Sequence, residues 1–251
     1  MFNYPVLFFP LSLFVLWLSA LVGTLLRSRR PMIGEEHEDF GFVQAAALTL
    51  LGLIIGFSFS MAIGRYDQRR NYEEAEANAI GTEYVRAGLL PASDAARVRA
   101  QLAKYLDLRV SFYRTRNQPE LQQINADTGQ LQTEMWTAVQ NPALAQPTPV
   151  MALAVAGMND VLNSQGYTQA AWWNRIPKAA WSLMIAIAIC CNLLIGYCAR
   201  GAHLKSTVLM ILPLFVSIAF LLIADIDAPR GHLIHVPPQN LLSLSQSLPK
   251  S

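Results

Sequence analysis

Four long stretches without a charged residue constrain this chain more than any other feature. They are Pro5 to Leu26, Gly41 to Gly64, Ala179 to Ala199, and Ser206 to Ala224. A helix of about 20 apolar residues crosses the hydrocarbon core of a bilayer. Only 14% of the chain is charged and 53% is hydrophobic, whereas soluble domains carry about 25% charged residues. The sequence therefore predicts an all-α integral membrane protein with four transmembrane helices, at residues 5–26, 41–64, 179–199 and 206–224.

The segment that follows the second span is polar, but it keeps the features of a helix. No proline lies between Pro31 and Pro91, and the stretch "NYEEAEANAIGTEYVRAGLL" is dense in Glu, Ala and Leu, which favour helix. Its apolar positions recur at spacings of three and four residues. We therefore expect the second span to continue as one helix to about residue 90. Residues 65–178 should form a helical extramembrane domain, inserted between the second and third spans, and residues 225–251 a C-terminal tail.

Prolines and tryptophans suggest further boundaries in the extramembrane segment. The stretch "NPALAQPTPV" is predicted to be a connector, followed by a short amphipathic helix over residues 151–163. Trp172, Trp173 and Trp181, together with Arg175 and Lys178, precede or begin the third span. Tryptophans with flanking basic residues typically anchor a membrane helix at the depth of the lipid headgroups, which is the role we expect here.

Small residues recur at every fourth position of the second span, at Gly52, Gly56, Ser60 and Gly64. That spacing places them along one face of a helix. Such a strip allows close packing against another helix. Alternatively, the strip lines a pore that several subunits share. Both interpretations need a partner helix, and both therefore favour an oligomer.

Charged residues gather where the second and fourth spans end. The predicted members of this cluster are Arg65, Asp67, Arg69, Arg70, Asp225, Asp227 and Arg230. The two spans run in the same direction, so their charged ends should lie at one depth. Charges near the hydrocarbon edge are costly unless they are paired, which predicts a structural ion-pair cluster. A cation site at the two aspartates, or a ring of arginines at a pore mouth, is the functional alternative.

Motifs for catalysis, cofactors and metals are not found in this sequence. It contains no Ser-His-Asp arrangement, phosphate loop, H-E-x-x-H or CxxC. The formal net charge of +2, without a basic patch that interleaves with aromatic residues, does not suggest nucleic acid. We expect no enzyme activity, no cofactor, no bound metal and no nucleic-acid partner.

Two blocks of the sequence resemble a known family. They are "FSMAIGRYDQRR", continued by "EANAIGTEYVRAGLLP", and near the end "DIDAPRGHLIHV". The matching positions are Arg65, Asp67, Arg69, Arg70, Glu76 to Thr82, Tyr84, Arg86, Leu89 to Pro91, Asp225, Asp227, Pro229, Arg230 and Gly231. This pattern is similar to the bestrophin-like domain family of bacterial membrane proteins, and the two blocks bracket most of the chain.

The resemblance implies an oligomeric ion channel. Bestrophins have four membrane helices and a helical cytosolic domain around a central pore. The resulting expectation is a homo-oligomer in the bacterial inner membrane that conducts small inorganic ions through a pore lined by the second span. The alternative is a non-conducting scaffold or assembly subunit whose helical domain binds a partner protein. The orientation stays open, because the basic residues of the short loops place those loops in the cytoplasm, whereas the resemblance places the helical domain there.

Overall fold

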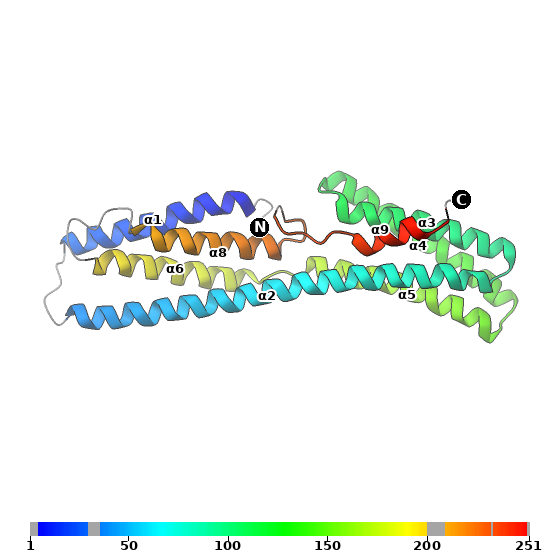
Figure 1. Cartoon of the computed structure of the whole chain (residues 1–251), viewed down its shortest axis with the longest axis horizontal. Helices are drawn as coiled ribbons and strands as arrows, with labels where there is room; N and C mark the ends of the chain where they lie inside the picture. The colour runs from blue at the N-terminus through cyan, green and yellow to red at the C-terminus, as the bar shows by residue number, and fades with distance from the viewer. Residues whose placement is uncertain (1–4, 30–35, 200–208, 232, 250–251) are drawn as a thin grey trace. The chain divides into compact units, whose positions relative to one another are not determined.

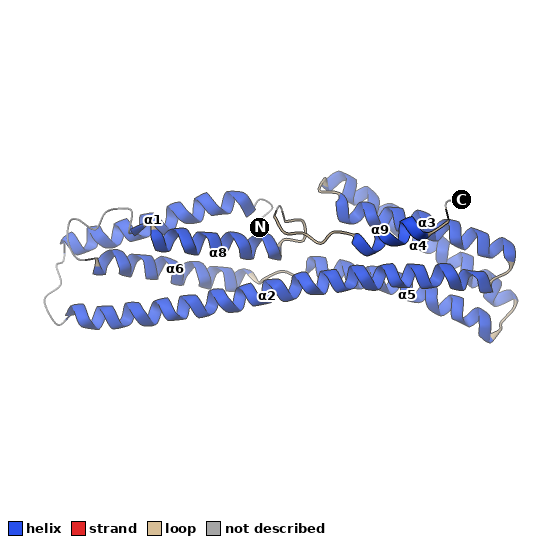
Figure 2. Ribbon diagram, in the orientation of Figure 1, coloured by secondary structure: helices blue, strands red, loops and turns tan. Residues whose placement is uncertain are grey.

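The computed structural model of the chain describes residues 5–29, 36–199, 209–231 and 233–249, and its regular elements are all helical. Figure 2 shows helices and loops, with no strand in the part that is described. The helices are α1 (Pro5–Arg29), α2 (Glu36–Arg86), α3 (Ala92–Arg114), α4 (Gln118–Ala145), α5 (Pro149–Trp173), α6 (Lys178–Cys198), α8 (Ile211–Asp227) and α9 (Gln239–Ser247), with a 3-10 turn, η1 (Ala87–Leu89). The all-α class that the sequence predicts is confirmed.

Helix α2 is the longest element, with 51 residues in one uninterrupted run (Figure 1). At a rise of 1.5 Å per residue it is roughly 75 Å long. It continues past Gly64 into the charged segment because no proline interrupts it and the residues beyond are strong helix formers. It ends where η1 tightens the chain before Pro91, which is fixed at φ −52°.

The chain divides into two compact units, and the boundary between them crosses α2 after Tyr66. The first unit holds residues 1–66 and 175–235, and the second holds residues 67–174 and 236–251. The first unit therefore contains α1, the apolar part of α2, α6 and α8. The second contains the polar part of α2, η1, α3, α4, α5 and α9.

In the first unit, α1, α6 and α8 pack against one another (Figure 1). Helices α1 and α6 run parallel, since Phe8 lies against Trp181 while the Ser19 hydroxyl donates to the Ile189 carbonyl at 2.8 Å. The rings of Phe8, Trp181 and Phe220 form a cluster with centroids 5.6 to 6.2 Å apart. Aromatic contacts of this geometry stabilise by more than their buried area alone.

Helices α1 and α6 also approach one another closely at two glycines. A Cβ added to Gly23 would overlap the Leu193 carbonyl oxygen, and one added to Gly196 would overlap the Ala20 carbonyl oxygen. Each glycine therefore lets the backbone of one helix touch the backbone of the other. This is the close packing through small residues that is typical of membrane helices.

Three helical stretches of the described residues are long and apolar enough to cross a membrane. They are Phe8–Arg29, Asp39–Leu89 and Pro149–Cys198, each containing an 18-residue window of mean hydropathy 2.1. The first residues of the predicted fourth span, 206–208, lie outside the described part of the chain, and the described helix there, α8, has 17 residues. Large apolar side chains such as Leu11, Phe14, Phe42 and Phe57 are more than half exposed. Apolar surface of this kind is typical of a protein embedded in lipid.

The second unit is a helical layer with its own core. Its buried side chains come from every helix of the unit, and include Ile80, Val98, Leu102, Tyr105, Phe112, Met135, Val139, Met158, Val161, Trp172 and Leu241. The short helix α9 is held by Glu73 on α2, whose carboxylate accepts from the Leu241 backbone N–H at 3.0 Å and from Asn240 Nδ2 at 2.6 Å. A carboxylate at a helix N-terminus satisfies donors that have no partner within the helix.

Three expectations for the second unit differ from the structure. The predicted connector of residues 141–150 is mostly helical, because α4 continues to Ala145 and α5 begins at Pro149. Helix α5 begins at Pro149 and runs to Trp173, well beyond residue 163. Proline is favourable at the first position of a helix, and the Thr148 hydroxyl caps it by accepting from the Met151 N–H at 3.3 Å. Trp172 is not a headgroup anchor, because it is only 4% exposed and packs on Phe112 with ring centroids 4.8 Å apart.

Candidate functional site

The first candidate site is the strip of small residues on α2. Gly52, Gly56, Ser60 and Gly64 are all exposed in the single chain, and a Cβ added to any of the three glycines would meet no atom within 4 Å. The opposite face of the same stretch, with Leu51, Ser58 and Ala62, is buried against the chain's own helices. The strip therefore points away from the other helices of the first unit.

The glycines that do make close contacts within the chain lie elsewhere. Gly23 and Gly196 bring the α1 and α6 backbones together, a contact that the sequence analysis missed. A signal was present, since Ser19 and Gly23 are small residues four positions apart. The strip on α2 has no such partner among the described residues of the chain.

The second candidate site lies where α2 leaves its apolar stretch and α8 ends. Arg65 Nη1 lies 3.4 Å from Asp227 Oδ1. Both oxygens of Asp227 also accept from the Ile176 backbone N–H, at 3.1 Å each. The Arg65 and Asp227 side chains are 18% and 9% exposed, so the pair is screened from water more than an ordinary surface pair. This contact connects α2, α8 and the segment that leads into α6.

Asp225 is fully buried and organises the turn that follows α8. Its Oδ2 accepts from the backbone N–H groups of Leu233 and Ile234, at 3.0 and 2.7 Å. Gly231 is required in this turn, because a Cβ there would overlap the Asp225 carbonyl oxygen. The Asp225 carboxylate thus accepts from backbone N–H groups, and the Asp227 carboxylate accepts from a backbone N–H group and from Arg65. These hydrogen bonds suit a structural role for both aspartates.

The other residues of the predicted cluster are distributed between the two units. Arg230 is half-buried in the first unit. Asp67, Arg69 and Arg70 belong to the second unit, where Arg69 is 1% exposed and the other two are exposed. Among the described residues, no group of three or more His, Cys, Asp or Glu side chains could hold a metal ion.

A buried polar network in the second unit was not foreseen from the sequence. Glu76 on α2 and Arg109 on α3 form an ion pair in which both side chains are inaccessible to solvent. Tyr113 and Thr168 donate to Glu76 Oε2, at 3.4 and 3.2 Å, and the guanidinium carbon of Arg109 lies 4.3 Å from the Phe112 ring centre. Burial and the Glu76 charge raise the pKa of Tyr113, so this phenol stays a donor. The network connects α2, α3 and α5.

Glu83, seven residues beyond Glu76, is buried in the same unit without a hydrogen-bond partner for either carboxylate oxygen. It faces Gly157 on α5, where an added Cβ would overlap Glu83 Oε2. Burial is the main cause that raises the pKa of Glu83 to about 8, with Asp160 adding to the rise and Arg86 opposing it. Of the other glutamates in this part of α2, Glu73 and Glu76 are also buried and Glu74 is exposed.

Comparison with known proteins shows to which family this chain belongs. Its apolar helices and all-α fold define an integral membrane protein. A profile of the Bestrophin-like domain matches residues 7–241. The chain therefore belongs to the bestrophin-like family, as the two sequence blocks predict. No curated protein sequence matches it.

Solved structures show the same fold. A bacterial Bestrophin homolog from Klebsiella pneumoniae, phased with zinc, is 14% identical with a TM-score of 0.66, and the match covers 98% of this chain and 100% of that chain. Two single-substitution variants of the homolog from Klebsiella pneumoniae are each 13% identical, with TM-scores of 0.66 and 0.67. These matches cover 94% and 95% of this chain, and 98% and 96% of those chains. Because the sequence identity to these structures is only 13% to 14%, the similarity shows a shared fold.

Proposed function

We propose that this protein is a subunit of a homo-oligomeric ion channel of the bacterial inner membrane, with a pore lined by the apolar half of α2. The observation that carries the proposal is the orientation of the small-residue strip. Gly52, Gly56 and Gly64 face open space, while Leu51 and Ala62 on the other side of α2 are buried in the chain's own core. A membrane helix that presents its smallest side chains away from its own subunit leaves room for a passage between subunits.

Membership of the bestrophin-like family supports the same function, because the resemblance to bestrophins implies an oligomeric ion channel. In the proposed arrangement the four spans are residues 5–26, 41–64, 179–199 and 206–224. The helical domain of residues 65–178 stands outside the bilayer, and residues 225–251 form the tail. Small inorganic ions are the proposed cargo.

The charged residues at the end of the strip suit a structural role in this channel. Arg65 follows Gly64 directly, and its pairing with Asp227 fixes the end of the apolar part of α2 relative to α8. The Arg65–Asp227 pair is mostly buried. Separating the two side chains would leave a charge near the hydrocarbon edge, so the pair holds the end of the apolar part of α2 in place. The proposal assigns the members of the predicted cluster that lie in the first unit, Arg65, Asp225, Asp227 and Arg230, to holding the helix ends, without a bound metal.

The proposal is tested by recording currents from the purified protein in planar bilayers. The wild-type protein should give unitary currents. Gly56→Leu and Ser60→Leu should reduce the unitary conductance severalfold, because each places a large side chain on the strip. The matched control is Met61→Leu, which changes a 44% exposed side chain. Met61 lies one residue beyond Ser60 and five beyond Gly56, so it is on another face of α2 than these two positions, and its replacement should leave the conductance unchanged.

The competing interpretations give different results in the same experiment. If the strip packs against a neighbouring helix and no lumen exists, Gly56→Leu breaks the oligomer on size-exclusion chromatography instead of narrowing a conducting pore. If the protein is a scaffold, the wild-type bilayers stay silent and another protein co-purifies. Either result would contradict the proposed pore.

A further inference from the structure

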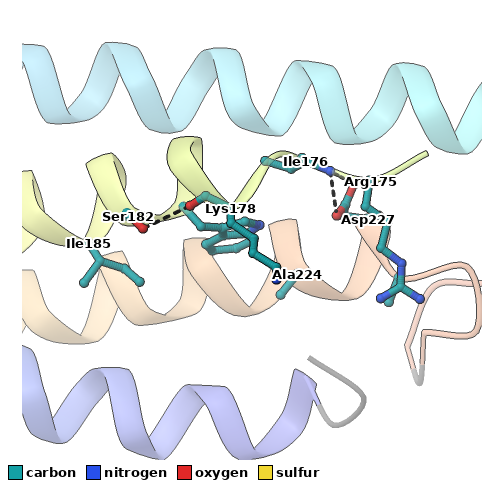
Figure 3. Close-up of a pocket in the computed structure, with 9 residues that line it drawn as sticks. Arg175, Ile176, Lys178, Ser182, Ile185, Ala224 and Asp227 are labelled. Atoms are coloured by element: carbon teal, nitrogen blue, oxygen red, sulfur yellow. Dashed lines mark hydrogen bonds between the residues drawn. The ribbon is translucent and has the colours of Figure 1, made fainter. Parts of the chain in front are cut away.

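A pocket of about 320 Å³ opens in the first unit between the start of α6 and the end of α8 (Figure 3). Arg175, Lys178 and Ser182 come from the α6 side, and Ala224 and Asp227 come from α8. All of its lining residues belong to this one unit. The pocket shares Asp227 with the Arg65–Asp227 contact, but it contains no residue of the strip on α2.

The charge of the pocket is positive. Arg175 and Lys178 are both exposed. The one acidic lining residue, Asp227, is already engaged, by the Ile176 N–H at 3.1 Å and by Arg65 at 3.4 Å. Figure 3 shows the hydrogen bond that the Ile176 N–H donates to Asp227. The Asp227 carboxylate therefore faces donors of the chain itself. Two cations therefore remain to attract an anion.

The rest of the pocket is apolar, and it leads toward the membrane. Trp181 and Ile185 line it along α6, one and two turns beyond Lys178. The predicted third span starts at Ala179, so the two cations stand at the depth of the lipid headgroups and the apolar lining stands at the edge of the hydrocarbon. A ligand that fits must carry an anion at one end and a hydrocarbon chain at the other.

We propose that this pocket binds an anionic phospholipid from the surrounding bilayer. The lipid phosphate lies between Arg175 and Lys178, and the first methylenes of an acyl chain lie against Trp181 and Ile185. The volume corresponds to roughly ten water molecules, which suits a phosphate group and a few methylenes but not a whole lipid. Basic pockets beside membrane helices are a recurrent site for anionic headgroups.

The test measures lipid binding to the purified full-length protein by native mass spectrometry. The probes are phosphatidylglycerol, phosphatidylcholine and inorganic phosphate, each titrated into the detergent-solubilised protein. Phosphatidylglycerol should bind saturably and more tightly than phosphatidylcholine. The double variant Arg175→Gln/Lys178→Gln should bind phosphatidylglycerol roughly 25-fold more weakly, from about a factor of five for each cation.

Arg29→Gln is the matched control for the single variant Arg175→Gln, because each removes one exposed arginine and Arg29 lies at the other end of the parallel pair α1 and α6. It should leave the affinity unchanged. If the double variant does not fold, Ile185→Trp replaces it, since the larger side chain fills the apolar part of the pocket and keeps both cations. This variant should weaken phosphatidylglycerol binding severalfold.

Three results would overturn the proposal. Equal affinity for the two lipids would show that charge does not select the ligand. An equal loss of affinity in the control and the pocket variants would show that general electrostatic attraction holds the lipid. Binding of inorganic phosphate as tight as that of phosphatidylglycerol would make this a site for free phosphate. Because the readout is binding, a failure here is distinct from silent bilayers.

Discussion

Glu83 makes the stability of the second unit depend on pH, and its replacement by glutamine removes that dependence. The side chain is fully buried, neither carboxylate oxygen has a hydrogen-bond partner, and the pKa is raised from 4.5 to about 8, mainly by burial. The folded state therefore holds the proton more tightly than the unfolded chain does. The stabilisation is fully present below the unfolded pKa and is lost as the pH rises through the folded pKa.

The magnitude follows from these two pKa values. One pKa unit corresponds to about 1.4 kcal/mol. Between about pH 6 and about pH 9 the free energy of unfolding should fall by about 3 kcal/mol, because over most of this range the unfolded chain has released the proton that folded Glu83 still holds. For a chain of this size, that corresponds to roughly 6 to 12 °C in the unfolding temperature. Glu83→Gln, which mimics the neutral carboxyl, should show no such fall.

The assay is thermal unfolding of the detergent-solubilised protein, followed by circular dichroism across this pH range. The difference between wild type and variant is the relevant quantity, because all other titrating groups are common to both. Arg86 opposes the rise in the pKa of Glu83, so Arg86→Gln should move the loss of stability to higher pH. If the unfolding temperatures of the wild type and of Glu83→Gln changed with pH in parallel, the result would refute the reasoning.

Other substitutions test the packing and the ion pair. Gly157→Ala should destabilise the protein by about 1–3 kcal/mol, because the added methyl overlaps the buried Glu83 carboxylate. Its control is Gly166→Ala, whose Cβ meets nothing within 4 Å and which should be neutral or stabilise by up to about 1 kcal/mol. A lower unfolding temperature for Gly166→Ala than for Gly157→Ala would contradict the packing of Gly157 against Glu83. Gly196→Ala should be more damaging than Gly157→Ala, because it overlaps backbone in place of a side chain, and equal unfolding temperatures would argue against the close α1–α6 contact. Asp227→Asn should lower stability at neutral pH, because it removes the carboxylate charge that lies 3.4 Å from Arg65 Nη1. An unchanged unfolding temperature would show that this pair contributes nothing.

The helical class and the family could be predicted from the sequence because they depend on local signals. The charge-free stretches predict membrane helices by length alone. The polar half of α2 is helical because no proline occurs between Pro31 and Pro91 and because Glu and Ala favour helix. These signals depend on neighbouring residues in the sequence and not on contacts between distant segments.

Features that depend on the tertiary arrangement could not be predicted in the same way. Spacing places Gly56 on one face of α2, but it does not tell which face meets the chain's own core. Glu76 and Arg109 are 33 positions apart, and their pairing is decided by how α3 packs on α2. Trp172 resembles an interfacial anchor by its position before the third span, yet the packing of Phe112 against it makes it a core residue.

The central claim is that several copies of α2 surround a pore. An electron-microscopy reconstruction of the detergent-solubilised protein tests it most directly. We predict a symmetric particle with a continuous central channel, in which the Gly52 to Gly64 strip of each copy faces the axis. A monomer, or an oligomer in which this strip faces the detergent, would contradict the claim.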